Sequence, residues 1–178
     1  MHTSNFRKVK RITDVIKIFA NINRAIPAKL LMIGDGPERN KAENLCRELD
    51  ICENVRFLGK LEAVEEVLSV ADLFLMPSEK ESFGLAALEA MACEVPVIST
   101  NTGGLPELNI QGVTGFLSNV GDVDDMSARA LEVLNAANLP RFKANAVARA
   151  RVFDITQILP LYENFYCEIL DRAHANAI

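Results

Sequence analysis

Apolar and polar residues alternate in blocks along the chain, and the spacing within each block predicts its secondary structure. Short continuous apolar runs indicate strands that are covered on both faces, whereas apolar residues three or four positions apart indicate helices. The predicted strands cover residues 29–33, 55–59, 72–76, 95–99 and 115–118. The predicted helices cover residues 12–26, 37–49, 64–68, 82–92, 124–137, 140–152 and 155–173.

This alternation of strands and helices predicts an α/β fold with a Rossmann-like, doubly wound parallel sheet. Ligands of such sheets bind beyond the carboxyl ends of the strands. Four turns follow strand ends: the basic turn after Asn5, Gly34-Asp35-Gly36, the turn around Glu81, and Gly103-Gly104. We therefore expect these four turns to converge on one edge of the sheet.

The chain starts abruptly. Residues 1–5 run straight into the basic turn, where a parallel α/β fold would place a complete apolar strand. We therefore expect residues 1–178 to form a single domain cut from a longer protein, with a C-terminal helix over residues 154–174.

Composition narrows the function classes. The 178 residues are 49% hydrophobic, which suits one domain with a sizeable core. The net charge of -5 argues against general nucleic-acid binding. No apolar run reaches the ~18 residues of a transmembrane helix, and no signal peptide is visible. We expect a cytoplasmic protein.

The cysteines and histidines do not form an obvious reactive centre. The four cysteines lack metal-type spacing and lie in apolar periodic segments, so we expect buried reduced thiols: Cys46, Cys52, Cys93 and Cys167. His2 and His174 lie at the two ends of the chain, which argues against a catalytic centre built on histidine.

The segment from Pro77 to Ala90 is the most informative. It leaves a predicted strand, crosses a polar turn and enters a helix, whose free N–H groups and dipole favour an anion. We expect Ser82 to cap the helix, with Glu81 in the turn and Glu89 in an apolar setting inside the helix. A surface position is the alternative for each carboxylate. The segment is typical of a site for a molecule with phosphates and hydroxyls.

Cations crowd the start of the first predicted helix: Arg7, Lys8, Lys10 and Arg11. The helix dipole already makes that end positive, so a bound diphosphate would offset the repulsion. A solvated basic run remains the alternative for any single residue. The sequence predicts that at least one of Arg7 and Lys10 binds phosphate.

Three further turns are weaker signals. Gly34-Asp35-Gly36 lacks the third glycine of the dinucleotide fingerprint, because Arg39 stands there, so a tight turn explains it equally well. Gly103-Gly104 suits either a close approach to a ligand or a plain turn. Residues 122–125 resemble an Asp-x-Asp metal site, but their place before an amphipathic helix favours a helix cap. We predict no metal site.

Together these motifs resemble the retaining glycosyltransferases of family 4, which have the GT-B fold of two Rossmann-like domains. Glu81 and Glu89 match the E-x7-E element of that family. The other matching segments follow in family order: residues 34–37, 57–59, 81–85, 89–92 and 103–107. The resemblance runs from about Thr3 to Leu170 and implies the C-terminal, donor-binding half, with the N-terminal acceptor domain missing.

The resemblance implies a role for each matching residue. Arg7 and Lys10 would bind the donor diphosphate, and Glu81 would lie beside the hydroxyls of the transferred sugar. Glu89 would accept hydrogen bonds from the ribose diol. The implied donor-binding set is Gly34, Phe57, Leu58, Ser82, Phe83, Gly84, Leu85 and Glu89, with the base near Phe57 and Leu58 and the sugar and phosphates along the backbone of residues 83–85.

Two features depart from the family pattern. Glu94 replaces a glycine that a left-handed helix cap would favour. The basic turn is also shorter than usual, so Lys8, Lys10 and Arg11 are alternatives for the second phosphate-binding cation.

The expected activity is transfer of a sugar from a UDP-sugar with retention of configuration and without a metal or other cofactor. Residues 4–11 and 78–85 are similar to enzymes of bacillithiol synthesis that move N-acetylglucosamine to L-malate. This resemblance implies UDP-N-acetylglucosamine as donor and L-malate as a candidate acceptor. The isolated chain is expected to be inactive, and homo-oligomers remain open. The alternatives are a sugar-nucleotide epimerase of the same fold, a Rossmann dehydrogenase and a non-catalytic nucleotide-binding module.

Overall fold

Parallel strands form the centre of the computed structural model, which describes residues 1–175 and the side chains of residues 1–172. Its strands are β1 (His2–Thr3), β2 (Leu30–Ile33), β3 (Val55–Gly59), β4 (Phe74–Met76), β5 (Val97–Thr100) and β6 (Gly115–Ser118). One ladder runs β1–β2–β3 and a second runs β4–β5–β6. Every pairing within the two ladders is parallel, as the continuous apolar runs predict.

The backbone of Met1 joins the two ladders. The N–H of Leu75 donates to the carbonyl oxygen of Met1 at 2.9 Å, and the Met1 nitrogen donates to the carbonyl oxygen of Leu73 at 2.7 Å. The strand order therefore becomes β3–β2–β1–β4–β5–β6, which is the order of doubly wound nucleotide-binding sheets. The strands before β4 are added toward one edge of the sheet and those from β4 on toward the other, so the strand order reverses between β1 and β4. Ligands of such sheets bind beside that reversal.

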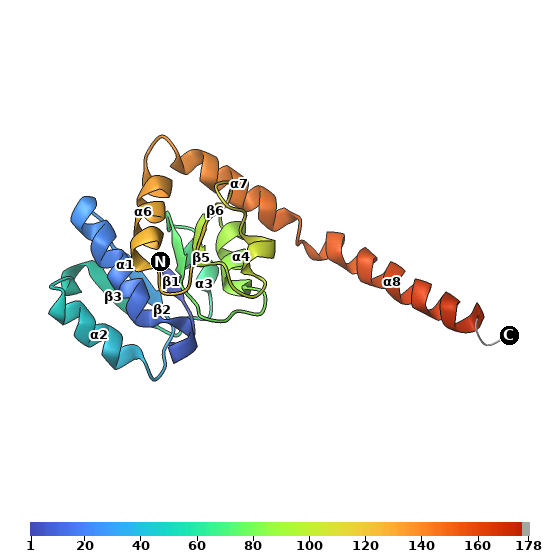
Figure 1. Cartoon of the computed structure of the whole chain (residues 1–178), viewed down its shortest axis with the longest axis horizontal. Helices are drawn as coiled ribbons and strands as arrows, with labels where there is room; N and C mark the ends of the chain where they lie inside the picture. Colours follow the sequence, from blue (N-terminus) through green and yellow to red (C-terminus); the bar gives the residue numbers. More distant parts are fainter. Residues whose placement is uncertain (176–178) are drawn as a thin grey trace.

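Helices cover both faces of this sheet (Figure 1). They are α1 (Ile12–Ala25), α2 (Arg39–Glu48), α3 (Val64–Leu68), α4 (Leu85–Ala92), α5 (Leu105–Leu108), α6 (Val123–Leu134) and α7 (Leu139–Arg151). Alternate residues of a strand face opposite ways. Leu75 of β4 accordingly packs in the core beneath α1 and α6, whereas Phe74 and Met76 pack in the core beneath α4 and α7.

The predicted helix over residues 82–92 begins three residues late. The structure starts α4 at Leu85 and places Gly84 at its N-cap position with a φ of 97°. That left-handed conformation favours glycine and cannot be part of the helix. Ser82 lies outside the helix, so the prediction that it caps the helix is wrong.

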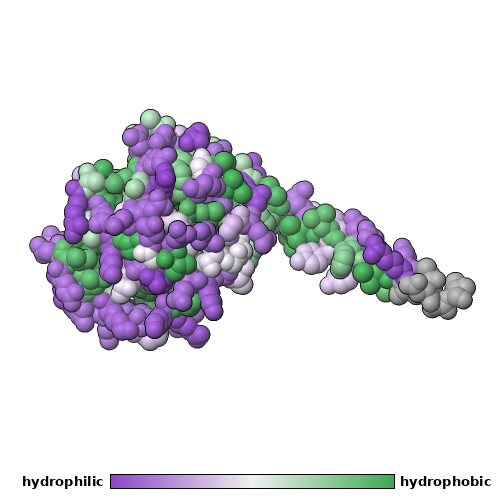
Figure 2. Space-filling model, viewed as in Figure 1, coloured by the Kyte–Doolittle hydropathy of each residue, from purple (hydrophilic) through white to green (hydrophobic). Residues whose placement is uncertain are grey.

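The last helix, α8 (Ile155–Ala175), extends away from the body of the molecule (Figure 1). Figure 2 shows apolar and polar residues interspersed along it. Its exposed large apolar side chains are Ile155, Leu159, Leu161, Tyr162, Phe165, Tyr166, Ile169 and Leu170. Among residues 1–175, no helix is both long enough and apolar enough to cross a bilayer.

A left-handed residue ends α4, at the position where the resemblance places a glycine. Glu94 has a φ of 63°. Its N–H donates to the carbonyl of Met91 at 3.1 Å, and the N–H of Val95 donates to that of Ala90 at 2.9 Å. These two bonds are the Schellman pattern, in which glycine is the favoured residue.

We predict that Glu94→Gly stabilises the chain. Glycine relieves the left-handed strain, which exceeds the entropy that a glycine loses on folding, so the free energy of unfolding should rise by about 1 kcal/mol. Urea denaturation measures the change. The matched control, Glu132→Gly, replaces an exposed residue within α6 and should lower stability by about 1 kcal/mol. Loss of stability in Glu94→Gly would contradict the prediction.

Candidate functional site

Two loops meet where the strand order reverses. Residues 4–11 follow β1 and residues 77–84 follow β4. The N–H of Glu79 donates to the carbonyl oxygen of Val9 at 2.8 Å. Lys10 Nζ lies 2.5 Å from Glu81 Oε2, and these side chains are only 20% and 13% exposed. The structure thus brings the basic turn and the Glu81 turn together at the expected edge of the sheet.

The four cations of the basic turn have different surroundings. Arg11 donates through Nε to Asp14 at 2.6 Å and precedes α1 with a φ of 50°. Lys10 pairs with Glu81, whereas Arg7 and Lys8 are exposed. Of the three alternatives for the second phosphate cation, Lys10 is therefore the residue beside Glu81, whereas Arg11 is already paired with the Asp14 carboxylate. Phosphate binding by Arg7 and Lys10 stays a prediction.

The glycine turns support these loops through close backbone contact. A Cβ atom at Gly34 would overlap the carbonyl oxygen of Ser4, and one at Gly103 would overlap that of Glu81. The N–H of Gly104 also donates to the carbonyl of Ser82 at 3.1 Å. Each glycine turn therefore packs against a neighbouring loop, which accounts for its glycines, and the predicted contact of Gly34 with the donor remains a prediction.

The start of α4 lies open beside the Glu81 turn. Ser82 is exposed, Phe83 is half-buried and Leu85 is 65% exposed. The first N–H groups of a helix lack partners within it, so this end can bind an anion. The expected donor-binding segment is thus in reach of solvent, although its contacts with a donor stay a prediction.

Glu89 occupies an exposed position on α4. The expectation of a buried carboxylate is therefore wrong, because the apolar residues around it in sequence face the core while Glu89 does not. Glu89 lies one helical turn after Leu85 on the same face, and its Cα–Cβ bond tilts toward the helix N-terminus. This geometry lets the Glu89 side chain reach a ribose bound near the start of α4. The ribose contact itself stays a prediction.

The end of β3 presents one covered ring and one exposed side chain. The Phe57 ring lies edge-on to Phe6 with centroids 6.4 Å apart, and the Arg39 guanidinium lies 5.6 Å from its centroid. Leu58 is 39% exposed. Arg39, which stands where the dinucleotide fingerprint needs glycine, also pairs with Glu43 at 2.8 Å. The predicted base-binding role of Phe57 and Leu58 is untested.

The acidic run at residues 122–125 caps a helix. The Asp122 side chain accepts a hydrogen bond from the Asp125 N–H at 3.0 Å, at the start of α6. Asp125 accepts in turn from the Ser118 hydroxyl at 2.7 Å. The helix-cap interpretation is confirmed. Across the described residues, no group of three or more His, Cys, Asp or Glu side chains could hold a metal ion.

His2 is a supporting residue that the sequence did not reveal. It is fully buried below the basic turn, with Nδ1 2.8 Å from the carbonyl oxygen of Leu75 and Nε2 2.9 Å from the Ser4 hydroxyl. A carbonyl only accepts, so Nδ1 carries the proton and Nε2 accepts from Ser4. Burial lowers the pKa of His2 to about 4, so the ring is neutral at pH 7. In the sequence, its position just before the basic turn was the feature that could have connected His2 with the site.

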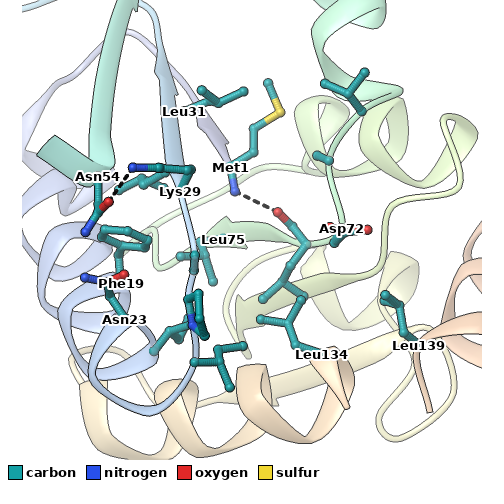
Figure 3. Close-up of a pocket in the computed structure, with 18 residues that line it drawn as sticks. Met1, Phe19, Asn23, Lys29, Leu31, Asn54, Asp72, Leu75, Leu134 and Leu139 are labelled. Atoms are coloured by element: carbon teal, nitrogen blue, oxygen red, sulfur yellow. Dashed lines mark hydrogen bonds between the residues drawn. The ribbon is translucent and has the colours of Figure 1, made fainter. Parts of the chain in front are cut away.

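A cavity of about 720 Å³ lies at the opposite edge of the sheet (Figure 3). Its lining is mostly apolar and includes Met1, Leu30 and Leu73, from the points where strands begin. The hydrogen bond from Met1 to Leu73 crosses it (Figure 3). Because ligands of these sheets bind at the carboxyl ends of the strands, this cavity is not the candidate site.

Comparison with known families agrees with this geometry. The family described as Glycosyl transferases group 1 matches residues 1–149. The chain belongs to this family. It is 46% identical over 175 residues to the N-acetyl-alpha-D-glucosaminyl L-malate synthase of Bacillus anthracis, covering 96% of this chain and 45% of that protein. The chain thus spans less than half of the length of that relative.

Solved glycosyltransferases share the fold. The sucrose-phosphate synthase of Thermosynechococcus elongatus superposes with a TM-score of 0.84 at 28% identity, over 96% of this chain and 45% of that one. The pneumococcal O-GlcNAc transferase GtfA, solved with UDP and GlcNAc, gives a TM-score of 0.86 at 20% identity, over 95% and 35%. These neighbours are GT-B glycosyltransferases, and the predicted fold class is confirmed.

We predict that His2 makes stability fall as the solution becomes more acidic. Between its ordinary pKa of 6.5 and its folded pKa of about 4, the unfolded chain takes up a proton that the folded chain does not. The free energy of unfolding should lose about 3 kcal/mol as pH drops through this window. Urea denaturation at several pH values measures the slope. His2→Gln should have a shallower slope, and equal slopes in the two proteins would overturn the prediction.

We predict that Gly103→Ala destabilises the Glu81 turn. Its new Cβ would meet the Glu81 backbone, and its φ of 56° is strained for alanine, so the loss should be about 3 kcal/mol. The control is Gly59→Ala, whose φ is 70° but whose Cβ would meet nothing within 4 Å. That variant should lose only about 1 kcal/mol. Thermal denaturation measures both losses. An equal fall in melting temperature in the two variants would show that the close contact has no effect.

Proposed function

We propose that this chain is the UDP-sugar-binding domain of a retaining, metal-independent glycosyltransferase. The observation that carries the proposal is the ion pair between Lys10 and Glu81 at the reversal of strand order. A cation and a carboxylate from different loops stand there beside the exposed start of α4. A nucleotide sugar has complementary groups, because its diphosphate suits the cation and the helix end, and its hydroxyls suit the carboxylate.

The proposed chemistry separates the sugar from a diphosphate leaving group. The bond between the anomeric carbon and the phosphate oxygen breaks, and its electron pair stays on the diphosphate. Arg7, Lys10 and the N–H groups at the start of α4 stabilise that growing negative charge, so the proposal needs no metal. The acceptor hydroxyl attacks from the same face and gives its proton to the departing phosphate, which retains the configuration.

In this proposal Glu81 orients the sugar and does not attack it. A covalent two-carboxylate route needs a free carboxylate beside the anomeric carbon. Glu81 is paired with Lys10 at 2.5 Å, and Glu89 lies on a separate element at an exposed position. Glu81 therefore accepts hydrogen bonds from sugar hydroxyls, and Glu89 accepts from the ribose diol.

The proposed donor is UDP-N-acetylglucosamine and the proposed acceptor is L-malate, in the cytoplasm. The 46% identity to the malate synthase of Bacillus anthracis supports both choices. Since this chain covers 45% of that relative, we assign the acceptor site to sequence outside these residues. The isolated chain is accordingly expected to bind donor and to transfer little.

Calorimetric titration with UDP and uridine tests the assigned roles. Arg7→Ala should weaken UDP about tenfold by removing a charge-assisted hydrogen bond, while uridine, which lacks phosphates, is unaffected. Glu89→Ala should weaken both ligands because both carry the ribose. Arg47→Ala, an exposed cation on α2, is the control and should change neither. If Arg7→Ala loses as much affinity for uridine as for UDP, Arg7 does not bind the diphosphate. If the unsubstituted chain does not bind UDP at millimolar concentration, that counts against the proposed function.

A further inference from the structure

An aromatic pair links the proposed donor loop to the end of α7. The ring of Phe83, two residues before α4, lies edge-on to the ring of Phe153 with centroids 5.3 Å apart and an interplanar angle of 66°. Phe153 lies between α7 and α8 and is partly buried. Edge-to-face packing of this kind stabilises beyond its buried area, so the pair fixes the direction of Phe83.

Arg149 holds Phe153 in turn. Its guanidinium carbon lies 4.8 Å from the centre of the Phe153 ring. Its Nε donates to the carbonyl of Leu108 at 3.3 Å, and another of its nitrogens donates to the carbonyl of Glu107. These carbonyls belong to the last residues of α5, where a helix leaves its oxygens without partners. The Arg149 side chain thus donates hydrogen bonds to the free carbonyls at the end of α5. It also covers the Phe153 ring, which supports the donor loop.

The same turn also contacts α5 directly. A Cβ at Gly84 would lie 2.6 Å from Leu105 Cδ2, so the buried Leu105 side chain would have to shift to admit it. The turn at Phe83 and Gly84 is therefore in contact with both Leu105 and Phe153. Gly84 alone would allow many backbone conformations, so these contacts select the one that starts α4 at Leu85.

We propose that Phe153 and Arg149 are positioning residues for donor binding. Neither belongs to the Glu81 turn or the basic turn; they act by holding Phe83, and through it the direction of the first N–H groups of α4. Backbone donors bind a phosphate well only when they are fixed in the productive direction before it arrives. This inference rests on the proposed function, since it assumes that the start of α4 binds the diphosphate.

Hydrogen–deuterium exchange tests the positioning without any ligand. In Phe153→Ala, peptides that cover residues 82–86 should exchange faster, while peptides from α1 and α2 keep their rates. Val152→Ala removes a neighbouring side chain that is 51% exposed and should leave residues 82–86 unchanged. Faster exchange across all of these peptides, or no change at residues 82–86, would overturn the inference.

Calorimetry with UDP and uridine then tests the effect on binding. Phe153→Ala and Arg149→Ala should each weaken UDP by about three- to tenfold and leave uridine unchanged, because only phosphates need the aligned N–H groups. Phe153→Tyr keeps the edge-to-face pair and should restore UDP binding. Arg151→Ala, on an exposed position two residues further along α7, is the control for Arg149→Ala.

The outcomes separate this inference from the proposed function. Wild-type affinity for UDP in Phe153→Ala, or equal losses of UDP and uridine, would overturn the positioning role and leave the proposed function in place. Failure of the unsubstituted chain to bind UDP would overturn both. Selective loss of UDP in the two alanine variants, with recovery in Phe153→Tyr, would support both.

Discussion

The insertion of β1 between β2 and β4 is the contact on which the site depends. Two backbone hydrogen bonds, between Met1 and the residues Leu73 and Leu75, join two three-stranded ladders into one sheet. With that pairing the strand order reverses beside β1, and the loops after β1 and β4 have to leave the sheet side by side. The buried His2, which bonds both to β4 and to Ser4, reinforces the same junction.

Charge and close packing then shape the site. Lys10 and Glu81 neutralise each other across the junction while partly shielded from water, so neither is left as an unpaired charge. Gly34 and Gly103 let neighbouring loops approach more closely than any side chain would allow. Lys10 and Glu81, which form this pair, are also residues that we assign to donor binding. In the proposed function the diphosphate lies against Lys10 and the sugar hydroxyls against Glu81, so a ligand that carries both groups meets both partners of this pair.

Much of this arrangement could be predicted from the sequence. Apolar runs identified the long strands because a parallel sheet is covered on both faces, and helical spacing identified α1, α6 and α7 close to their observed bounds. The expectation of four buried thiols is wrong, because Cys52 and Cys167 are exposed. The other errors occur where a single backbone angle or a neighbour decides. Gly84 shifts the start of α4 to Leu85, and the fold turns Glu89 toward solvent although its sequence neighbours are apolar.

The sequence by itself determined the fold class, the family and the order of the turns, because periodicity and motif spacing are local properties of the chain. It also predicted the helix cap at Asp122. Only the tertiary structure paired Lys10 with Glu81, buried His2 near them and set the Phe83 ring edge-on to that of Phe153. These contacts join residues about 70 positions apart, and no local pattern specifies which side chains meet once the sheet is assembled.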